Sequence, residues 1–227
     1  MPSLQYVALA IVPIGLGFAA RFWVSAAFRA AGRVQAVSGV TGSEAALQLL
    51  TANGCADVSL ETADGELTDH YDPGERVIRL SQEVGEESSV GALAVVAHEV
   101  GHVLQDREGD RAFRVQRAIV PVASFCSYGW LAAIAAGLFL ESAGLVAAAL
   151  ALFAAVALFH VATLPVELGA SRRALSLLAT QQLLTVEELP VARRVLRAAA
   201  GTYLVAALVA ITEALRLALE LALAGEE

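Results

Sequence analysis

The sequence predicts a mainly α-helical integral membrane protein with about four transmembrane helices and a small α+β, zincin-like cytoplasmic domain. Two observations support this prediction. Of the 227 residues, 57% are apolar and the mean hydropathy is +0.65, which is too apolar for an ordinary water-soluble domain. The apolar residues also gather in four runs, each near the roughly 20 residues that a helix needs to cross a bilayer.

The apolar runs divide the chain into membrane and polar regions. The first run follows no positively charged segment, so we expect an anchor that stays rather than a cleaved signal peptide. The second and third runs are separated by only two residues and predict a tight helical hairpin. The expected regions are an N-terminal transmembrane helix (1–23), a catalytic region (24–117), a transmembrane hairpin (118–164), a cytoplasmic helical segment (165–200) and a C-terminal transmembrane helix (201–227).

Charge sets the expected orientation. All 15 basic residues are arginine, and 14 of them lie in residues 21–117 or 165–200. The positive-inside rule therefore places both polar regions in the cytoplasm and both termini outside. The net charge of −8 disfavours a nucleic-acid partner, which would require a basic face. Only two cysteines are present, so a disulfide framework is not expected.

The fourth run is the least regular, because it contains Glu213, Arg216 and Glu220. Their spacing places them on one helical face, where opposite charges can pair. Two interpretations stay open: a stripe turned to the bundle interior or the membrane interface, and a functional polar path.

Turn and capping signals predict the elements of region 24–117. The segment Thr41-Gly-Ser-Glu44 is a capping box that opens a helix ending near Asn53-Gly54. The turn signal Asp72-Pro-Gly-Glu75 joins two strands into a β-hairpin. Ser88 or Ser89 caps a helix that runs to about Gln105. The expected strands are 58–61, 66–71 and 76–81.

Two helix starts are expected in residues 165–200. Pro165 fits the first turn of a helix, which would begin where the third apolar run ends. A second capping box, Thr185-Val-Glu-Glu188, predicts a helix that leads into the fourth run.

The segment His98-Glu-Val-Gly-His102 points to metal chemistry. Residues four apart share a helical face, so His98 and His102 could bind one zinc ion, while Glu99 acts as general base on a water. Gly101 would let another backbone approach this helix closely. The alternative is that the two histidines are merely neighbours on a helix.

A catalytic zinc needs a third protein ligand from elsewhere in the chain. Glu167 is the natural candidate, because it is the only carboxylate between Ser142 and Val186. A solvated glutamate near a helix start is the alternative, and His160 is the competing ligand. Ser171 and Arg173 could orient Glu167. Histidine and carboxylate ligands also accept manganese, cobalt or nickel.

His70 and Tyr71 lie in the predicted hairpin. A strand beside a metal helix can pair with the substrate backbone, so either side chain could donate a hydrogen bond to the oxyanion. The alternative is a pair of surface turn residues.

These motifs resemble those of the YugP-like membrane proteins, a family classed as putative neutral zinc metallopeptidases. The resemblance rests on three segments and extends over nearly the whole chain, including the order of apolar runs. It implies a bacterial membrane protease in which His98 and His102 bind zinc, Glu99 is catalytic and Glu167 is the third ligand. The chain departs from the pattern at Leu168-Gly169. The segments are 68–73, 97–105 and 163–171, followed by Arg173-Ala174.

The sequence therefore predicts a zinc-dependent metalloendopeptidase at the cytoplasmic face of the bacterial inner membrane. Its expected partners are a peptide or membrane-protein substrate and the lipid bilayer; small residues in the spans also suit a homo-oligomer or a membrane partner protein. Two alternatives stay open. One is a non-catalytic membrane scaffold or chaperone partner that keeps the fold, and the other is an intramembrane, site-2-like metalloprotease.

Overall fold

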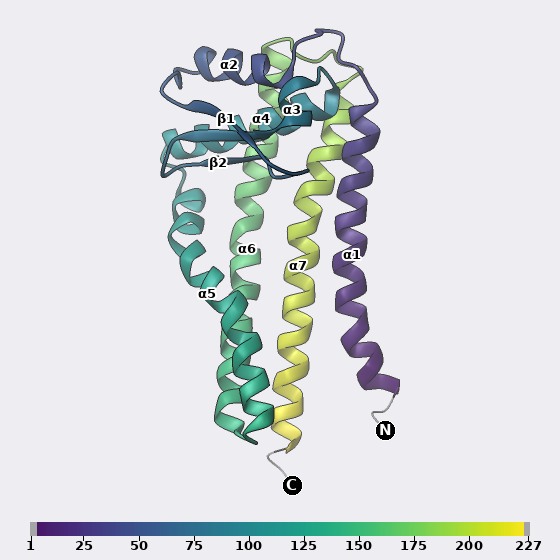
Figure 1. Cartoon of the computed structure of the whole chain (residues 1–227), viewed down its shortest axis with the longest axis vertical. Helices are drawn as coiled ribbons and strands as arrows, with labels where there is room; N and C mark the ends of the chain where they lie inside the picture. Colours follow the sequence, from purple (N-terminus) through teal and green to yellow (C-terminus); the bar gives the residue numbers. More distant parts are fainter. Residues whose placement is uncertain (1–3, 225–227) are drawn as a thin grey trace. The chain divides into compact units, whose positions relative to one another are not determined.

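The computed structural model describes residues 4–224 and shows two compact units, each described separately below (Figure 1). For residues 4–14, 138, 143, 213 and 216–224 only the backbone is described. The side chains of the predicted charged stripe, Glu213, Arg216 and Glu220, are therefore outside the described part of the structure. Among the described residues, the first unit comprises 4–20, 114–165 and 201–224, and the second, called here the catalytic unit, comprises 21–113 and 166–200.

The catalytic unit begins with the elements that the capping signals predict. Helix α2 (Gly42–Ala52) starts at Thr41, whose side chain accepts from the Glu44 N–H while the Glu44 carboxylate accepts from the Thr41 N–H. The predicted capping box is therefore confirmed. Helix α3 (Gln82–Glu86) is short and follows the last strand.

A three-stranded sheet has the order β1-β3-β2, which leaves β2 at an edge. The strands are β1 (Ser59–Ala63), β2 (His70–Asp72) and β3 (Val77–Ser81). The predicted hairpin is confirmed, because β2 and β3 are antiparallel and Asp72 Oδ1 accepts from the N–H groups of Gly74 and Glu75 in the turn. Strand β2 is shorter than the predicted 66–71, and β1 pairs with β3 in parallel.

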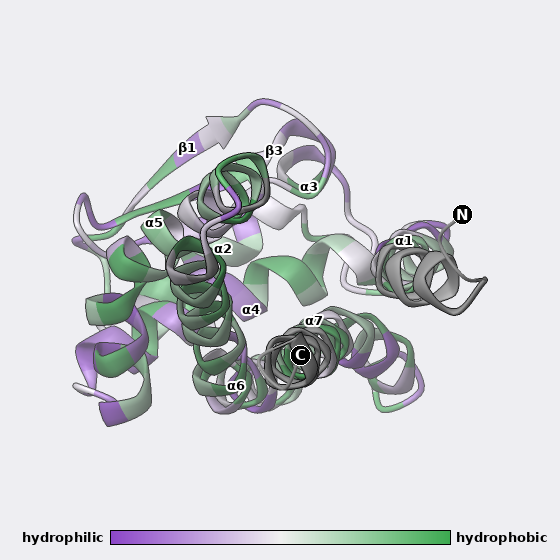
Figure 2. Ribbon diagram, turned by 90° about the horizontal axis from the view of Figure 1, so that it is seen from below, coloured by the Kyte–Doolittle hydropathy of each residue, from purple (hydrophilic) through white to green (hydrophobic). Residues whose placement is uncertain are grey.

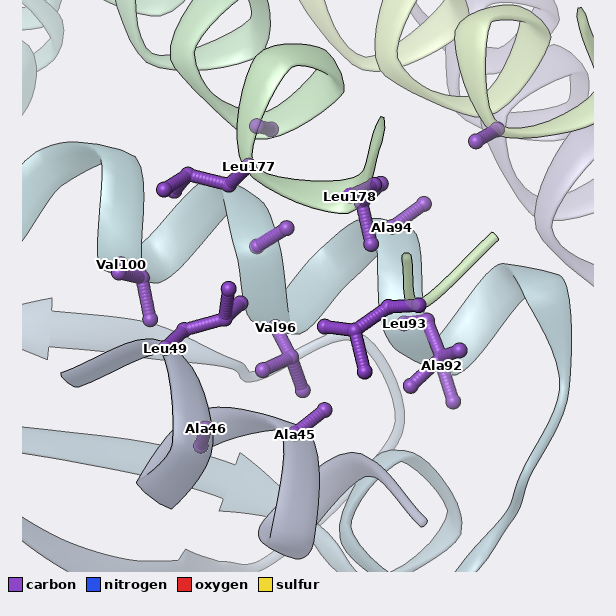
Figure 3. Close-up of a cluster of buried hydrophobic side chains, with 14 of the residues drawn as sticks. Ala45, Ala46, Leu49, Ala92, Leu93, Ala94, Val96, Val100, Leu177 and Leu178 are labelled. Carbon is purple, nitrogen blue, oxygen red and sulfur yellow. The ribbon is translucent and has the colours of Figure 1, made fainter. Parts of the chain in front are cut away.

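Helix α4 (Val90–Arg107) is central to the core of the catalytic unit. Its side chains Leu93, Val96 and Val100 are fully buried. Figure 3 shows them on the side of α4 that faces Leu49 of α2, while Leu177 of α6 lies on the other side of α4; all belong to one buried cluster. Because α4 is enclosed on both sides, side chains on it can be held away from water in fixed positions.

Helices α5 (Arg111–Phe139) and α6 (Ala143–Thr180) cover the predicted hairpin. The expectation that a new helix starts at Pro165 is wrong, because α6 runs through this residue without interruption. Proline removes one backbone hydrogen bond from a helix, whereas breaking the helix in an apolar setting would leave several polar backbone groups unsatisfied. The single helix therefore contributes residues to both units.

Helix α7 (Leu189–Ala224) starts later than the second capping box predicts. The Glu188 carboxylate accepts from the Thr185 N–H as expected, but its other oxygen accepts from the backbone N–H of Val37 at 2.8 Å. Residues 186–188 form a turn before the helix. Glu188 is thus shared between the local turn and a distant loop, and the Leu189 N–H donates to the Thr185 carbonyl at 3.1 Å where the helix begins.

Three of the helices described are long and apolar enough to cross a membrane: Arg111–Gly137, Gly144–Thr180 and Leu189–Thr212. Helix α1 (Leu4–Gly32) coincides with the first predicted span, but the side chains of its first half lie outside the description, so four spans stay a prediction. In Figure 2 the ribbon of α6 is predominantly apolar. Large apolar side chains of the first unit are exposed, as membrane helices require. Phe125 and Phe139 of α5 are examples.

Candidate metal centre

Helix α4 carries the two histidines of the centre. The Ser89 side chain caps the start of this helix by accepting a hydrogen bond from the Ala92 N–H at 3.1 Å. This helix presents His98 and His102 one turn apart, with ring centroids 4.7 Å apart and planes at 85°. The two Nε2 atoms lie 3.2 Å from each other. Both imidazoles therefore turn the same nitrogen toward one point.

Glu167 of α6 completes the group. Its carboxylate oxygens lie 3.1 Å from His98 Nε2 and 3.8 Å from His102 Nε2. The candidate ligand atoms of these three residues all lie within 4.8 Å of one another. Residues 69 positions apart in the chain are thus brought together in a largely buried setting.

The spacing of the donor atoms fits a zinc ion. In a tetrahedral site with bonds of about 2.0–2.1 Å, the ligand atoms would be about 3.3 Å apart. The separations of 3.1, 3.2 and 3.8 Å are close to that edge length. Two histidines and one carboxylate, with one position left open, also match the ligand chemistry of catalytic zinc. The residues present therefore suit the metal.

Close backbone packing brings α6 to α4. A Cβ atom added to Gly101 would lie 2.7 Å from the Ala170 carbonyl oxygen, so no other residue fits without displacement. The expectation that Gly101 admits another backbone is confirmed. The approach holds the Glu167 side of α6 against the histidine face of α4.

The two histidines differ in their affinity for protons. Burial lowers the pKa of His98, but its hydrogen bond with Glu167 and the negative charges of Glu99 and Glu167 outweigh this, and the net pKa is raised. Burial and the neighbouring charge of His98 lower the pKa of His102 to about 4. In the metal-free protein, the Glu167 carboxylate therefore favours the protonated imidazole of His98 and does not do the same for His102.

Glu99 is buried beside the three ligand candidates. Burial, the dominant cause, raises its pKa to about 7; the charges of Glu167 and Asp69 also raise it, while His98 lowers it. The backbone N–H of Tyr71 hydrogen-bonds to the carboxylate. A carboxyl group with a pKa near neutrality can both accept and release a proton at physiological pH.

Gln105 is the residue of this site to which the sequence analysis assigned no role. Its side chain is 1% exposed, and its Oε1 lies 2.9 Å from His102 Nδ1. Its Nε2 donates to the Val166 carbonyl at 2.9 Å. With the amide oxygen as acceptor, His102 carries its proton on Nδ1 and leaves Nε2 free for a metal. The spacing His102–Gln105, one helical turn, was the available signal.

Ser171 and Arg173 make contacts other than those predicted. Ser171 Oγ lies 3.4 Å from His98 Nδ1, so it contacts a histidine on the side opposite the ligand nitrogen. Arg173 pairs with Glu108 at 2.6 Å and with Asp110 at 3.6 Å. These ion pairs join Arg173 of α6 to the two acidic residues that follow the end of α4.

The hairpin residues lie beside Glu99 but turn their side chains elsewhere. The Tyr71 hydroxyl donates to Asp106 Oδ2 at 3.0 Å, and its backbone N–H hydrogen-bonds to the Glu99 carboxylate. His70 is exposed, with Nδ1 2.7 Å from the Thr68 carbonyl oxygen. An oxyanion role for either side chain stays a prediction.

His160, the competing ligand, lies in the first unit and is not a member of the metal-ligand group found among the described residues. Its Nδ1 is buried and has no hydrogen-bond partner among them, and the same holds for Thr163 Oγ1. The described ligand set therefore contains Glu167 as its carboxylate.

Known proteins with similar sequences agree with this chemistry. Residues 6–222 match the family described as "Putative neutral zinc metallopeptidase". A relative from Bacillus subtilis (strain 168), described as "Putative membrane protease YugP", is 41% identical over 211 residues, which cover 93% of this chain and 94% of the relative. No solved structure is significantly similar to the chain.

Proposed function

We propose that this chain, which belongs to the putative neutral zinc metallopeptidase family, is a membrane-embedded zinc peptidase that hydrolyses peptide bonds at the cytoplasmic membrane face. The family match agrees with the resemblance seen in the three sequence motifs. The observation that carries the proposal is the convergence of His98, His102 and Glu167, with Glu99 buried beside them.

In this proposal, different side chains bind the metal, transfer the proton and orient a metal ligand. Held by His98, His102 and Glu167, zinc would supply Lewis-acid chemistry, polarising a carbonyl and acidifying a water. Glu99 would accept the proton of the attacking water and pass it to the departing amine nitrogen. In the metal-free protein burial raises its pKa to about 7, and a zinc ion beside it would favour the carboxylate that accepts this proton. Gln105 would keep the His102 ring in the orientation and protonation that leave Nε2 available.

The substrate would bind along β2. This strand is at the sheet edge, pairs only with β3, and carries the Tyr71 N–H that contacts Glu99. An extended peptide can add to such an edge by backbone hydrogen bonds. That placement would bring a peptide bond beside Glu99, and would leave His70 and Tyr71 as the nearest candidates for contacting the oxyanion.

Helix lengths favour a site at the membrane face. The candidate membrane-spanning helix Gly144–Thr180 has 37 residues, well beyond the roughly 20 that a bilayer needs, and Glu167 lies in the part assigned to the catalytic unit. Helix α4 has 18 residues and ends in charged residues. The arginine distribution then supports a cytoplasmic location for 24–117 and 165–200 in an inner membrane. Substrates would be membrane-proximal peptide segments.

Metal content tests the proposal directly. We would purify the full-length wild type and the variants Glu167→Ala and His160→Ala, and measure zinc per chain by elemental analysis. One zinc in the wild type and in His160→Ala, lost in Glu167→Ala, is the expected result.

Zinc retained in Glu167→Ala but lost in His160→Ala would instead move the third ligand into the membrane helices and favour an intramembrane protease. Absence of stoichiometric metal from the wild type would overturn the enzymatic proposal in favour of the non-catalytic scaffold.

A further inference from the structure

A groove of about 510 Å³ lies in the catalytic unit, away from the metal-ligand group. Its volume is within the ~300–1,000 Å³ typical of ligand sites. One wall is the end of α1, with Trp23 and small side chains such as Ala27 and Ala30. The other wall is the start of α7, which supplies Val191, Arg194 and Arg197. The groove is therefore apolar along its length and cationic on one side.

The two groove arginines differ from several other arginines of the catalytic unit. Arg79, Arg107 and Arg173 each pair with carboxylates. Among the side chains that the structure describes, Arg194 and Arg197 have no carboxylate within ion-pair distance.

The nearest acidic residue along the chain, Glu188, already uses its two oxygens for the backbone N–H groups of Val37 and Thr185. Two uncompensated guanidinium groups therefore line one apolar groove.

Their spacing suits a single anion. Arg194 and Arg197 are one helical turn apart on the face of α7 that also presents Val191 to the groove. Guanidinium groups bind phosphate oxygens in a planar, two-pronged manner. The small side chains Ala27 and Ala30 leave space beside them for an alkyl chain, and tryptophan favours the boundary between headgroups and hydrocarbon.

We propose that this groove binds one anionic phospholipid, with the phosphate on Arg194 and Arg197 and part of an acyl chain against the alanines of α1. Its position supports a lipid over a soluble anion, because both arginines lie near the start of Leu189–Thr212, a helix that is long and apolar enough to cross a membrane. The inference does not depend on the peptidase activity. It requires only that this end of α7 lies at a membrane surface.

The two tryptophans of the chain allow a direct test. Replacing Trp130 with Phe leaves Trp23 as the only indole, at the groove. We would reconstitute this full-length variant in phosphatidylcholine nanodiscs and add either dibrominated phosphatidylglycerol or dibrominated phosphatidylcholine as quencher. Preferential binding predicts half-maximal quenching at roughly 30-fold less phosphatidylglycerol than phosphatidylcholine, since each of the two arginines near an anionic lipid contributes about 1 kcal/mol.

Matched variants separate the groove from general surface charge. Arg194→Gln with Arg197→Gln should abolish the preference, whereas Arg193→Gln, on the same helix but outside the groove, should preserve it. Ala30→Leu, which fills the groove at an exposed position, should weaken it. Unchanged zinc content would show that each variant is folded.

Three results would overturn the proposal. Equal quenching by both lipids would mean that Trp23 senses only bulk bilayer. An equal loss in Arg193→Gln would indicate diffuse charge attraction. Release of the lipid by millimolar inorganic phosphate alone would identify a soluble-anion site.

Discussion

The two units use similar apolar side chains in opposite ways. In the catalytic unit, leucines such as Leu49 and Leu93 are fully buried in the core that encloses α4, the helix that carries both histidines. In the first unit, Phe139 is 86% exposed and Leu158 is 69% exposed, and the buried cluster consists of a few residues around Phe153. The catalytic unit can therefore shift the pKa values of buried groups by its own packing, while the first unit needs lipid to cover its surface.

This difference predicts where substitutions change chemistry and where they change only stability. The largest effect is expected for Glu99→Gln, which should lower peptidase activity by about 10²–10⁴-fold, the usual contribution of a general base. The amide keeps the shape of the side chain, so zinc content should stay at the wild-type level. Activity of the purified variant on a peptide substrate, measured beside zinc content, checks this. Full activity would exclude Glu99 as the base.

A pair of leucine truncations compares the two environments directly. Leu93→Ala removes a fully buried side chain of α4 and should cost about 2–5 kcal/mol of unfolding free energy. Leu158→Ala removes an exposed side chain of α6 and should change the unfolding temperature little. Thermal unfolding in detergent, followed by circular dichroism, measures both. Equal losses would show that the first unit also relies on tight internal packing at this position.

The pH dependence of stability tests the burial of Glu99. Its pKa rises from 4.5 to about 7 on folding, so the native state favours the protonated form. The stabilisation is complete below the unfolded value and is lost as pH rises through about 7. The metal-free wild type should therefore lose about 2 kcal/mol more than Glu99→Gln between about pH 5 and about pH 8.5.

Unfolding temperatures of chelator-treated protein provide that comparison. The raised pKa of His98 acts in the same direction, and the lowered pKa of His102 acts in the opposite direction at acidic pH. Both histidines are present in the variant as well, and because the Glu99 charge contributes to the raised pKa of His98, the difference between the two proteins reports Glu99 together with its interaction with His98. Parallel curves would indicate that Glu99 is ionised when buried.

The smallest effect is expected for Gln105, which acts on the metal through His102. Gln105→Ala should weaken zinc binding by about 10–100-fold, the usual consequence of losing a hydrogen bond to a metal-bound histidine. Gln105→Glu, which keeps an acceptor oxygen, should restore much of the affinity. Competition with a fluorescent zinc chelator measures both. A merely structural role would leave the two variants equally impaired.

Local signals in the sequence predicted the local structure well. The capping box at Thr41, the hairpin turn at Asp72 and the cap at Ser89 are confirmed, because each depends on residues within a few positions of one another. The metal-ligand group was also predictable, since the histidines share a helix turn and Glu167 is the only carboxylate in its region.

The errors arose where distant contacts compete with local preference. Pro165 resembles a helix start, but the surrounding apolar helix tolerates the loss of one hydrogen bond. Glu188 resembles a complete cap, but one oxygen bonds Val37, 151 residues away. Gln105 received no role because its second partner, the Val166 carbonyl, is on another helix. None of these partners could be identified from neighbouring residues.

The separation of the ligands along the chain also has a consequence in time. His98 and Glu167 are 69 residues apart, and ribosomes add about 5–20 residues per second. The histidine helix therefore leaves the ribosome about 3–14 seconds before the glutamate is made. During that interval the nascent chain carries two of its three ligands and no complete centre. The order of synthesis thus delays assembly of the His98–His102–Glu167 group until the helix that carries Glu167 has been made.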